Sequence, residues 1–360
     1  MMKTIACSAV LAVSLVSFNT AQAETALKHW PPETAAKLDA MIKAKAHKNN
    51  FAVFDADQTT YQYDLTEALL PFLEAKGVLT RASIPAFLKL IPFKDNEVGG
   101  KLEKESLYSY YQRLCAIDDQ VCYPWVAQIF SGLTLRQLKG YVDELLVLGK
   151  ENKEIPVQYY DGDKQMTAAV KAPKMYPGMQ ELYNELMRNG INVYVMSAAS
   201  EELVRMVLAD PKYGYNVKPQ NVIGVSVLLK DRKTGDLTTA RKLIAEKKYD
   251  PVKLMDYEYG HYLWAPLTWF EGKPAGIKTY IDQWKKPVLV AGDTPASDGP
   301  MLFELADVEK GGMRVWVNRK EQYWQTILQM QKENAAAQKQ LGLPVTADKN
   351  WVMVRPMQIQ

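Results

Sequence analysis

The stretch FAVFDADQTT, residues 51–60, decides the fold of this chain. Its first four residues form an unbroken apolar run, as expected for a strand covered on both faces in a parallel α/β sheet. The run ends at Asp55, and Asp57 follows on the next turn. Functional crevices of such sheets lie beyond the carboxyl ends of the strands, so both carboxylates are expected there. An Asx-rich turn after a strand is the alternative, but two carboxylates this close repel unless a cation or a shared proton holds them.

Residues 1–23 have the pattern of a secretory signal peptide. Lys3 begins a charged end, residues 5–18 are mostly apolar, and Ala21-Gln22-Ala23 is a small-x-small cleavage site. A retained membrane anchor is the alternative, although the apolar run is shorter than the ~20 residues that a spanning helix needs. The sequence therefore predicts a periplasmic or secreted protein.

Charge and histidine content narrow the classes of partner. The chain has 360 residues and a formal net charge of +3, and removal of the leader removes one lysine and no acid. A charge this near to balance predicts no nucleic-acid partner and no membrane partner. The three histidines are scattered along the chain, which argues against a histidine-built zinc centre. Any bound metal is expected to have oxygen ligands, which favours Mg²⁺, with Zn²⁺ or another divalent cation as the alternative.

Only two cysteines remain after the leader. Cys115 and Cys122 are separated by six residues. In an oxidising compartment this pair predicts one short-loop disulfide. Two free buried thiols are the alternative.

The chain after Asp57 is predicted to leave the sheet for more than one hundred residues. Helical apolar spacing recurs in residues 64–76, 83–90, 105–114, 123–130 and 133–148. We expect a helical cap domain over residues 61–159, inserted after the first core strand, because a helical block directly behind a candidate catalytic strand is typical of a lid. Asp161 and Asp163 lack the further oxygen ligands of a calcium loop and predict a polar turn.

The core is predicted to comprise residues 24–60 and 160–360. Strands are expected at residues 191–196, 286–290 and 313–317, a β-hairpin at 221–241, and helices at 33–48, 178–189, 201–208 and 320–340. Residues 342–360 carry no clear pattern. The predicted fold class is α/β, with a Rossmann-like, mostly parallel sheet.

Polar side chains follow three of these strands: Asp55 with Asp57, then Ser197, then Asp293 with Asp298. Each has a common structural explanation by itself, such as a helix cap or a strand-end turn. Together at the carboxyl ends of neighbouring strands they predict phosphoryl transfer through a covalent aspartyl phosphate. Asp55 would attack phosphorus. Asp57 would protonate the leaving group and later deprotonate water.

The remaining parts of such a site can also be assigned. Mg²⁺ would be held by Asp55, the backbone carbonyl of Asp57 and Asp293. Ser197 and the backbone N–H groups that follow it, beginning with Ala198, would hold phosphate oxygens at a helix start.

A lysine is also needed to bind the phosphate. Lys273 is favoured because Gly272 and Pro274 flank it at the mouth of a predicted helix. Lys285 and Lys286 are the competing lysines. Asp298 would orient Lys273 or a metal-bound water.

These residues resemble the motifs of the haloacid dehalogenase-like phosphatases. The matching segments are 55–59 for the first motif, 193–197 for the second, Lys273 for the third and 292–298 for the fourth. Within the first motif, Thr59 is assigned a supporting role. The resemblance implies a core of this family with a C1-type cap, and it is strongest to bacterial periplasmic members that hydrolyse phosphorylcholine.

That resemblance implies a substrate with a quaternary ammonium group, held in the cap by acidic and tyrosine side chains. The matching residues here are Glu67, Tyr110 and Tyr111, whereas Thr66 and Gln112 depart from the expected acid and tyrosine. A third aspartate expected in the fourth motif is replaced by Ala296. Weaker choline affinity or an altered metal dependence is expected to follow.

From the residues alone, the case for a cation site is weaker. Aromatic faces and a carboxylate hold quaternary ammonium groups, but adjacent helical residues such as Tyr110 and Tyr111 lie about 100° apart and cannot both face one pocket. Other small phosphomonoesters, such as phosphoethanolamine or sugar phosphates, remain alternative substrates. A choline-binding module on an inactive phosphatase fold is a further alternative.

Overall fold

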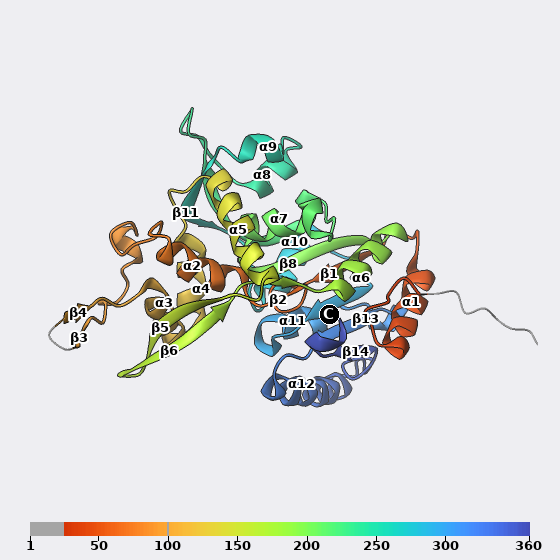
Figure 1. Cartoon of the computed structure of the whole chain (residues 1–360). Helices are drawn as coiled ribbons and strands as arrows, with labels where there is room; N and C mark the ends of the chain where they lie inside the picture. The colour runs from red at the N-terminus through yellow and green to blue at the C-terminus, as the bar shows by residue number, and fades with distance from the viewer. Residues whose placement is uncertain (1–24, 99–100) are drawn as a thin grey trace, which may run out of the picture.

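The computed structural model describes residues 25–98 and 101–360. The predicted signal peptide lies outside these residues. Figure 1 shows an α/β core carrying both a central sheet and the C-terminus, with a second group of helices and hairpins beside it. In the described part of the chain, no helix combines the length and the apolar character needed to cross a bilayer.

The central sheet has eight strands and is mostly parallel, as predicted. Strands β10 (Leu237–Thr238) and β11 (Glu258–Trp264) both run antiparallel to β9. The other strands pair in parallel in the order β9 (Val222–Lys230), β8 (Asn192–Ser200), β1 (Phe51–Phe54), β12 (Leu289–Gly292), β13 (Met313–Val317) and β14 (Trp351–Val354). The carboxyl ends of β1, β8 and β12 therefore lie side by side.

Strand β1 is buried along its whole length because helices cover both faces of the sheet. Phe51 and Val53 pack in one cluster with residues of α10 (Gly272–Tyr280), α11 (Pro295–Leu305) and α12 (Glu321–Gln340). Ala52 and Phe54 belong to the other cluster, together with residues of α1 (Pro32–Lys45), α6 (Pro177–Arg188) and α7 (Glu201–Leu208). Burial on both faces explains why no polar residue interrupts residues 51–54.

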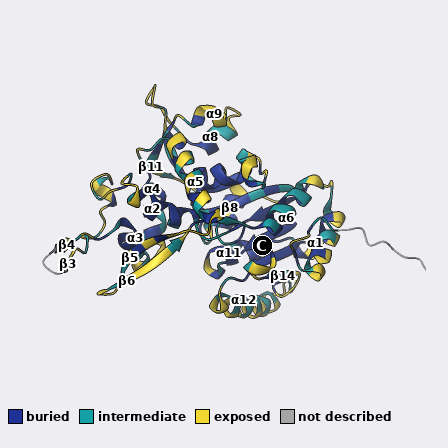
Figure 2. Ribbon diagram, viewed as in Figure 1, coloured by how far each residue is buried: buried dark blue, intermediate teal, exposed yellow. Residues whose placement is uncertain are grey.

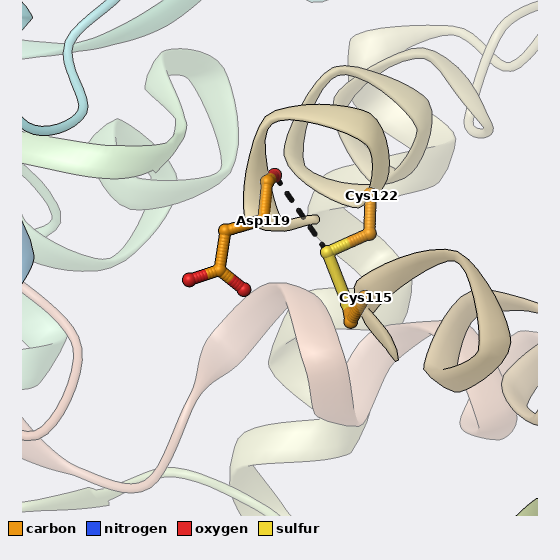
Figure 3. A group of neighbouring side chains, drawn as sticks. All are labelled: Cys115, Asp119 and Cys122. Atoms are coloured by element: carbon orange, nitrogen blue, oxygen red, sulfur yellow. Dashed lines mark hydrogen bonds between the residues drawn. A yellow bond between two sulfur atoms is a disulfide. The ribbon is translucent and has the colours of Figure 1, made fainter. Parts of the chain in front are cut away.

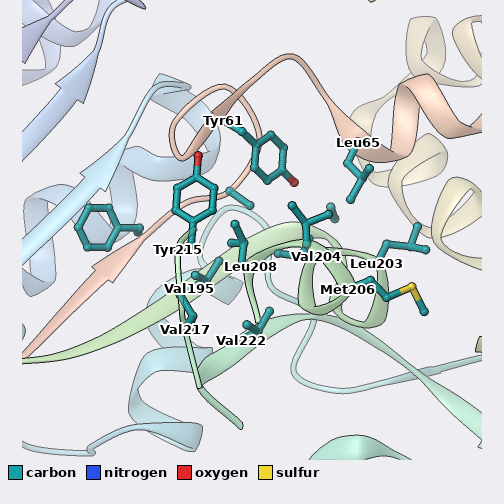
Figure 4. Packing of buried hydrophobic residues seen from close by; sticks show 14 of the residues in the cluster. Tyr61, Leu65, Val195, Leu203, Val204, Met206, Leu208, Tyr215, Val217 and Val222 are labelled. Carbon is teal, nitrogen blue, oxygen red and sulfur yellow. The ribbon is translucent and has the colours of Figure 1, made fainter. Parts of the chain in front are cut away.

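Helix α7 is packed closely between the sheet and the start of the cap. Figure 4 shows Leu203 and Val204 of α7 among Val195 and Val222 of the sheet and Leu65 of the first cap helix. The cap and the core therefore share one continuous apolar cluster. Elsewhere in the core, two short helices, α8 (Ala240–Ala245) and α9 (Pro251–Leu254), lie between β10 and β11 in the chain.

The segment after β1 forms the predicted cap, though it is not wholly helical. Its helices are α2 (Leu65–Ala75), α3 (Leu107–Ile117), α4 (Asp119–Gln128) and α5 (Leu135–Lys150). Its strands are β2 (Tyr61–Gln62), β3 (Asn96–Val98), β4 (Lys101–Glu103), β5 (Glu154–Asp161) and β6 (Lys164–Lys171). Strand β7 (Lys174–Met175) follows them and pairs with β2. Strands β5 and β6 pair over their full lengths, and β5 packs on α3.

Two expectations were wrong: a cap built of helices alone and a helix over residues 83–90. The polar turn predicted at Asp161 and Asp163 is present, but it connects a long hairpin in which Ile155, Val157 and Tyr160 turn inward while their neighbours face solvent. Residues 83–90 form only the short 3₁₀ turn Ala86–Leu88, since Pro85 disfavours helix at the residue before it. The featureless tail supplies the edge strand β14, whose pairing with β13 a local pattern cannot reveal.

Candidate active site

Three neighbouring strands bring the predicted site residues together. Asp55 follows β1, and its backbone N–H bonds to the carbonyl of Ala291 in β12. Asp293 directly follows β12, and Ser197 lies within β8. The three side chains line one cavity of about 470 Å³ together with Asp57 and Lys273. Their placement follows from the parallel order of the strands.

Lys273 supplies a buried positive charge to this cavity. It lies in the first turn of α10 and is 1% exposed. Its Nζ donates to Asp55 Oδ1 at 2.6 Å and to Asp298 Oδ1 at 2.5 Å. Burial opposes the charge of the ammonium, but Asp298 and Asp55 raise the pKa of Lys273 above its usual value. Lys285 and Lys286, the competing lysines, instead bond to backbone carbonyls at the surface.

Asp298 connects the lysine to the strand end. Its second oxygen accepts hydrogen bonds from the backbone N–H groups of Asp293 and Thr294 at 2.8 and 2.9 Å. A Cβ at Gly292 would lie 2.5 Å from the Asp298 Cβ, so this close approach requires glycine. Asp298 therefore has a bond on each oxygen and fixes both Lys273 and the turn after β12.

Asp293 is surrounded by donors. Thr59 donates to Oδ1 at 3.0 Å, Thr294 donates to Oδ2 at 2.9 Å, and Arg319 forms an ion pair with Oδ2. Burial raises the pKa of Asp293, and Arg319 opposes that shift. Arg319 was not among the predicted site residues, although it follows β13 at the same edge of the sheet, a position that could have revealed it.

Asp57 is aimed by the turn that follows β1. Gln58 has a φ of 62°, and the backbone N–H of Leu65 donates to Asp57 Oδ1 at 2.8 Å. Burial, together with nearby Asp64, raises the pKa of Asp57 well above its usual range. A raised pKa favours the protonated form of this carboxyl group, which is the form that a general acid needs.

Ser197 differs from its predicted setting. Strand β8 continues to Ser200 and α7 begins at Glu201, so Ser197 and Ala198 precede the helix by several residues. Ser197 is fixed by two bonds: its Oγ accepts from the N–H of Ala199 at 3.1 Å, and its carbonyl accepts from Thr268 at 2.6 Å. Ser197 and Ala198 both line the cavity.

The carboxylates at the strand ends are suited to a hard cation. Asp55, Asp293 and Asp298 each offer an oxygen within 4.8 Å of the others, and all three are buried. Burial and then Asp298 raise the pKa of Asp55 well above its usual range, although Lys273 opposes this. A divalent cation would relieve this concentration of charge, and carboxylate oxygens are the ligands that Mg²⁺ prefers.

The opposite wall of the cavity comes from the cap and is acidic. Asp64, Glu67 and Asp119 all line it. Burial, together with Glu67, raises the pKa of Asp64 to about 7. The aromatic side chains that line the cavity are those of Tyr111, Tyr123, Phe270 and Tyr323. Carboxylates and aromatic faces together suit an organic cation.

The residues proposed for choline divide into two groups. Glu67 and Tyr111 line the cavity, whereas Tyr110 is fully buried beside Trp125 and bonds through its hydroxyl to the backbone of Ile91. Tyr110 thus belongs to the cap core, as the 100° separation of adjacent helical residues requires.

Glu67 itself is positioned by two residues of α3. Tyr108 and Gln112 donate to its Oε1 at 3.0 and 3.1 Å. The sequence assigned no role to Tyr108, which lies one helical turn before Gln112.

The predicted disulfide is confirmed. Cys115 and Cys122 are bonded and join the end of α3 to α4 (Figure 3). Both sulfur atoms are used in this bond, so the nearby Asp119 does not complete a metal site with them. Cys115 and Asp119 both line the cavity, so the disulfide lies at its acidic wall.

Comparison with known proteins establishes the family. No family model matches the chain. It is, however, 62% identical over 336 residues to phosphorylcholine phosphatase of Pseudomonas aeruginosa, across 93% of this chain and 94% of that protein. The chain belongs to the phosphorylcholine phosphatase family. This relationship confirms the predicted resemblance to haloacid dehalogenase-like phosphatases and the prediction of a phosphoester hydrolase.

A solved structure agrees at the level of the fold. A conserved protein of unknown function from Anaerococcus prevotii superposes with a TM-score of 0.56 at 18% identity, over 86% of this chain and 92% of that one. A protein of unknown function from Bordetella pertussis gives a TM-score of 0.48 at 11% identity, over 85% and 98%. The first of these supports the α/β fold and carries no information on substrate.

Proposed function

We propose that this phosphatase hydrolyses phosphorylcholine to choline and phosphate. The observation that supports this substrate is the separation of charge within one cavity. Lys273 and Arg319 lie at the core end, and Asp64, Glu67 and Asp119 lie at the cap end. With the proposed divalent cation bound among the carboxylates of the core end, a zwitterion with an anionic phosphate and a cationic head would meet the opposite charge at each end.

The proposed reaction proceeds through an aspartyl phosphate. A carboxylate oxygen of Asp55 forms a bond to phosphorus while the bond from phosphorus to the choline oxygen breaks. Asp57 gives its proton to that leaving oxygen. Water then attacks phosphorus, Asp57 takes a proton from it, and the bond to Asp55 breaks to release phosphate.

Ser197, Ala198 and Lys273 are the proposed phosphate-binding residues. Mg²⁺ is the proposed cofactor, with Asp55, the Asp57 carbonyl and Asp293 as ligands, and Zn²⁺ or another divalent cation is the alternative. When bound, such a cation would offset the charge that the phosphate and the carboxylates bring together. Thr59 supports this set through its bond to Asp293, and Asp298 through its bond to Lys273.

Export and domain organisation complete the proposal. Residues 1–23 are the proposed signal peptide, and the mature protein is placed in the periplasm or outside the cell. We place the end of the cap near residue 171 instead of 159, because the hairpin of β5 and β6 packs on α3 and α2. The partner is a small molecule, held between the cap and the core.

One observation favours a related substrate, phosphoethanolamine. The hydroxyl of Thr66 is buried, lines the cavity and has no partner among the described residues. A primary ammonium group can donate a hydrogen bond to that oxygen, whereas a quaternary one cannot.

A substrate comparison tests the proposal and separates the two substrates. Purified protein with Mg²⁺ is given phosphorylcholine, phosphoethanolamine and p-nitrophenyl phosphate, and released phosphate is measured. The highest kcat/KM is expected for phosphorylcholine. A higher value for phosphoethanolamine would replace the substrate, and equal values for all three compounds would contradict a cation-selective cavity.

A further inference from the structure

Arg319 occupies a position that the proposed chemistry leaves unexplained. It lies between β13 and α12, it lines the cavity, and its side chain is 19% exposed. Its Nε forms an ion pair with Asp293 Oδ2, and its Nη2 donates to Thr294 Oγ1 at 3.0 Å. The guanidinium thus contacts Asp293 directly and also through Thr294, which itself donates to Oδ2.

The bonds on Asp293 leave one direction open. A carboxylate has about four lone-pair sites, two on each oxygen. Oδ2 accepts from Arg319 and from Thr294, while Oδ1 accepts only from Thr59 among the described residues. The remaining acceptor site is on Oδ1, and Asp293 belongs to the group of carboxylates whose oxygens lie within 4.8 Å of one another. Arg319 and Thr294 therefore saturate one oxygen and leave the other for a ligand.

The charges of the site are consistent with this arrangement. Asp55, Asp293 and Asp298 bring three negative charges when ionised, and Lys273 and Arg319 bring two positive charges in contact with them. The balance is one negative charge, to which a divalent cation can bind without leaving the buried carboxylates uncompensated.

Arg319 is itself held in place. Its guanidinium carbon lies 4.8 Å from the ring centre of Tyr323, in the first turn of α12. The planar, stacked guanidinium loses little further freedom when it forms its two bonds. A side chain fixed on both sides is suited to orienting a neighbour.

We infer that Arg319 is a positioning residue, which fixes the Asp293 carboxylate in the orientation that binds the divalent cation. The inference rests on the proposed metal-dependent activity. Residues that orient a metal ligand commonly contribute 10- to 100-fold to metal affinity, in order of magnitude.

Calorimetric titration of the metal-depleted protein with MgCl₂ tests the inference. Arg319→Ala is expected to weaken Mg²⁺ binding by about 10- to 100-fold. Arg319→Lys keeps the charge but lacks the planar guanidinium that forms two bonds, and it should weaken binding by an intermediate factor. Lys320→Ala is the matched control, because it removes the adjacent positive charge, whose contact is with the Tyr323 ring. It is expected to change Mg²⁺ affinity by less than about threefold.

Activity provides a second readout. Turnover of phosphorylcholine and of p-nitrophenyl phosphate by Arg319→Ala should be restored by excess Mg²⁺, because the defect lies in cation binding. Loss that excess Mg²⁺ does not restore would place Arg319 on the substrate and overturn the inference.

The remaining outcomes are also decisive. Unchanged Mg²⁺ affinity in a folded Arg319→Ala protein would overturn the inference, and tighter binding would show that Arg319 competes with the cation. If Arg319→Ala does not fold, Arg319→Lys decides by the same criterion. Wild-type protein that binds no divalent cation would overturn the proposed metal dependence and the inference with it, so the two failures are distinguishable.

Discussion

The ammonium nitrogen of Lys273 lies 2.5 Å from a carboxylate oxygen of Asp298, and neither side chain is more than 1% exposed. Asp298 in turn binds the backbone of Asp293 and Thr294. This contact connects α10 to the turn after β12, so the core end of the cavity, where phosphate is proposed to bind, is built around a buried ion pair.

Replacing Lys273 with methionine is expected to destabilise the fold as well as abolish turnover. It would leave Asp55 and Asp298 buried without the lysine ammonium that they share. Removal of one partner of a buried ion pair lowers the free energy of unfolding by about 3–5 kcal/mol. Urea unfolding measures this change. Lys278→Met, on the exposed side of the same helix, should change the free energy of unfolding by less than about 0.5 kcal/mol. Equal stability of the two variants would contradict the role of the buried pair.

Asp55→Asn should remove the proposed nucleophile without changing the shape of the site. Phosphate release is expected to fall by at least about 10⁴-fold, the scale seen when a catalytic nucleophile is removed. Rapid acid quench should detect phosphate bound to the wild-type protein and none bound to the variant. Asp163→Asn, at a surface turn, is the control and should retain activity. Substantial turnover by Asp55→Asn would exclude the aspartyl-phosphate route.

Glu67→Ala should affect only substrates with a cationic head. Loss of a partly buried carboxylate from the cap end is expected to raise KM for phosphorylcholine by about 10-fold or more. KM for p-nitrophenyl phosphate should stay within about twofold. Glu144→Ala, which removes an exposed cap glutamate paired with Lys76, is the matched control. A parallel loss for both substrates would indicate a structural role for Glu67.

Choline binding should depend on pH through Asp64. Because its pKa is raised to about 7, Asp64 is largely neutral at pH 6 and largely ionised at pH 8. Choline affinity, measured by calorimetry, is therefore expected to rise from pH 6 to pH 8. Asp64→Asn keeps a side-chain oxygen at the N-terminus of α2 that accepts from the N–H of Glu67, and it should abolish most of this rise in affinity. The same pH dependence in both proteins would assign it to another group.

The disulfide should stabilise both the fold and the cap end of the cavity, where the cationic head of the substrate is proposed to bind. Closing a loop with a sequence separation of 7 residues contributes about 2–3 kcal/mol on the chain-entropy account. The double variant Cys115→Ser/Cys122→Ser is expected to lose this amount in urea unfolding. Since α3 and α4 supply Tyr111, Gln112 and Asp119 to the cavity, KM for phosphorylcholine should rise while that for p-nitrophenyl phosphate is maintained. An unchanged free energy of unfolding would contradict the first part.

The sequence predicted those parts of the fold that local pattern determines. The apolar run at residues 51–54 and the helical spacing of α7 both gave elements within a residue or two of the observed bounds. Strand β14 was missed because only its pairing with β13 makes it a strand, and the hairpin of β5 and β6 because only the polar turn at its tip was predicted, without the strands on either side.

The same division applies to the site. Asp55, Ser197 and Asp293 were found because each follows or ends an apolar strand. Arg319 follows a strand too, but a single arginine after a strand has many ordinary explanations. Tyr110 was assigned to the substrate through the family resemblance, and the packing of Trp125 against it identifies it as core.

The bond from the Leu65 amide to Asp57 joins the first turn of the cap to the proposed proton donor. A cap displaced from the core would withdraw that bond and misdirect the proton. An arrangement with the cap displaced would therefore admit bulk water to the cavity but would leave Asp57 poorly aimed to activate it. A phosphorylated Asp55 would then be protected from hydrolysis while the cap is displaced.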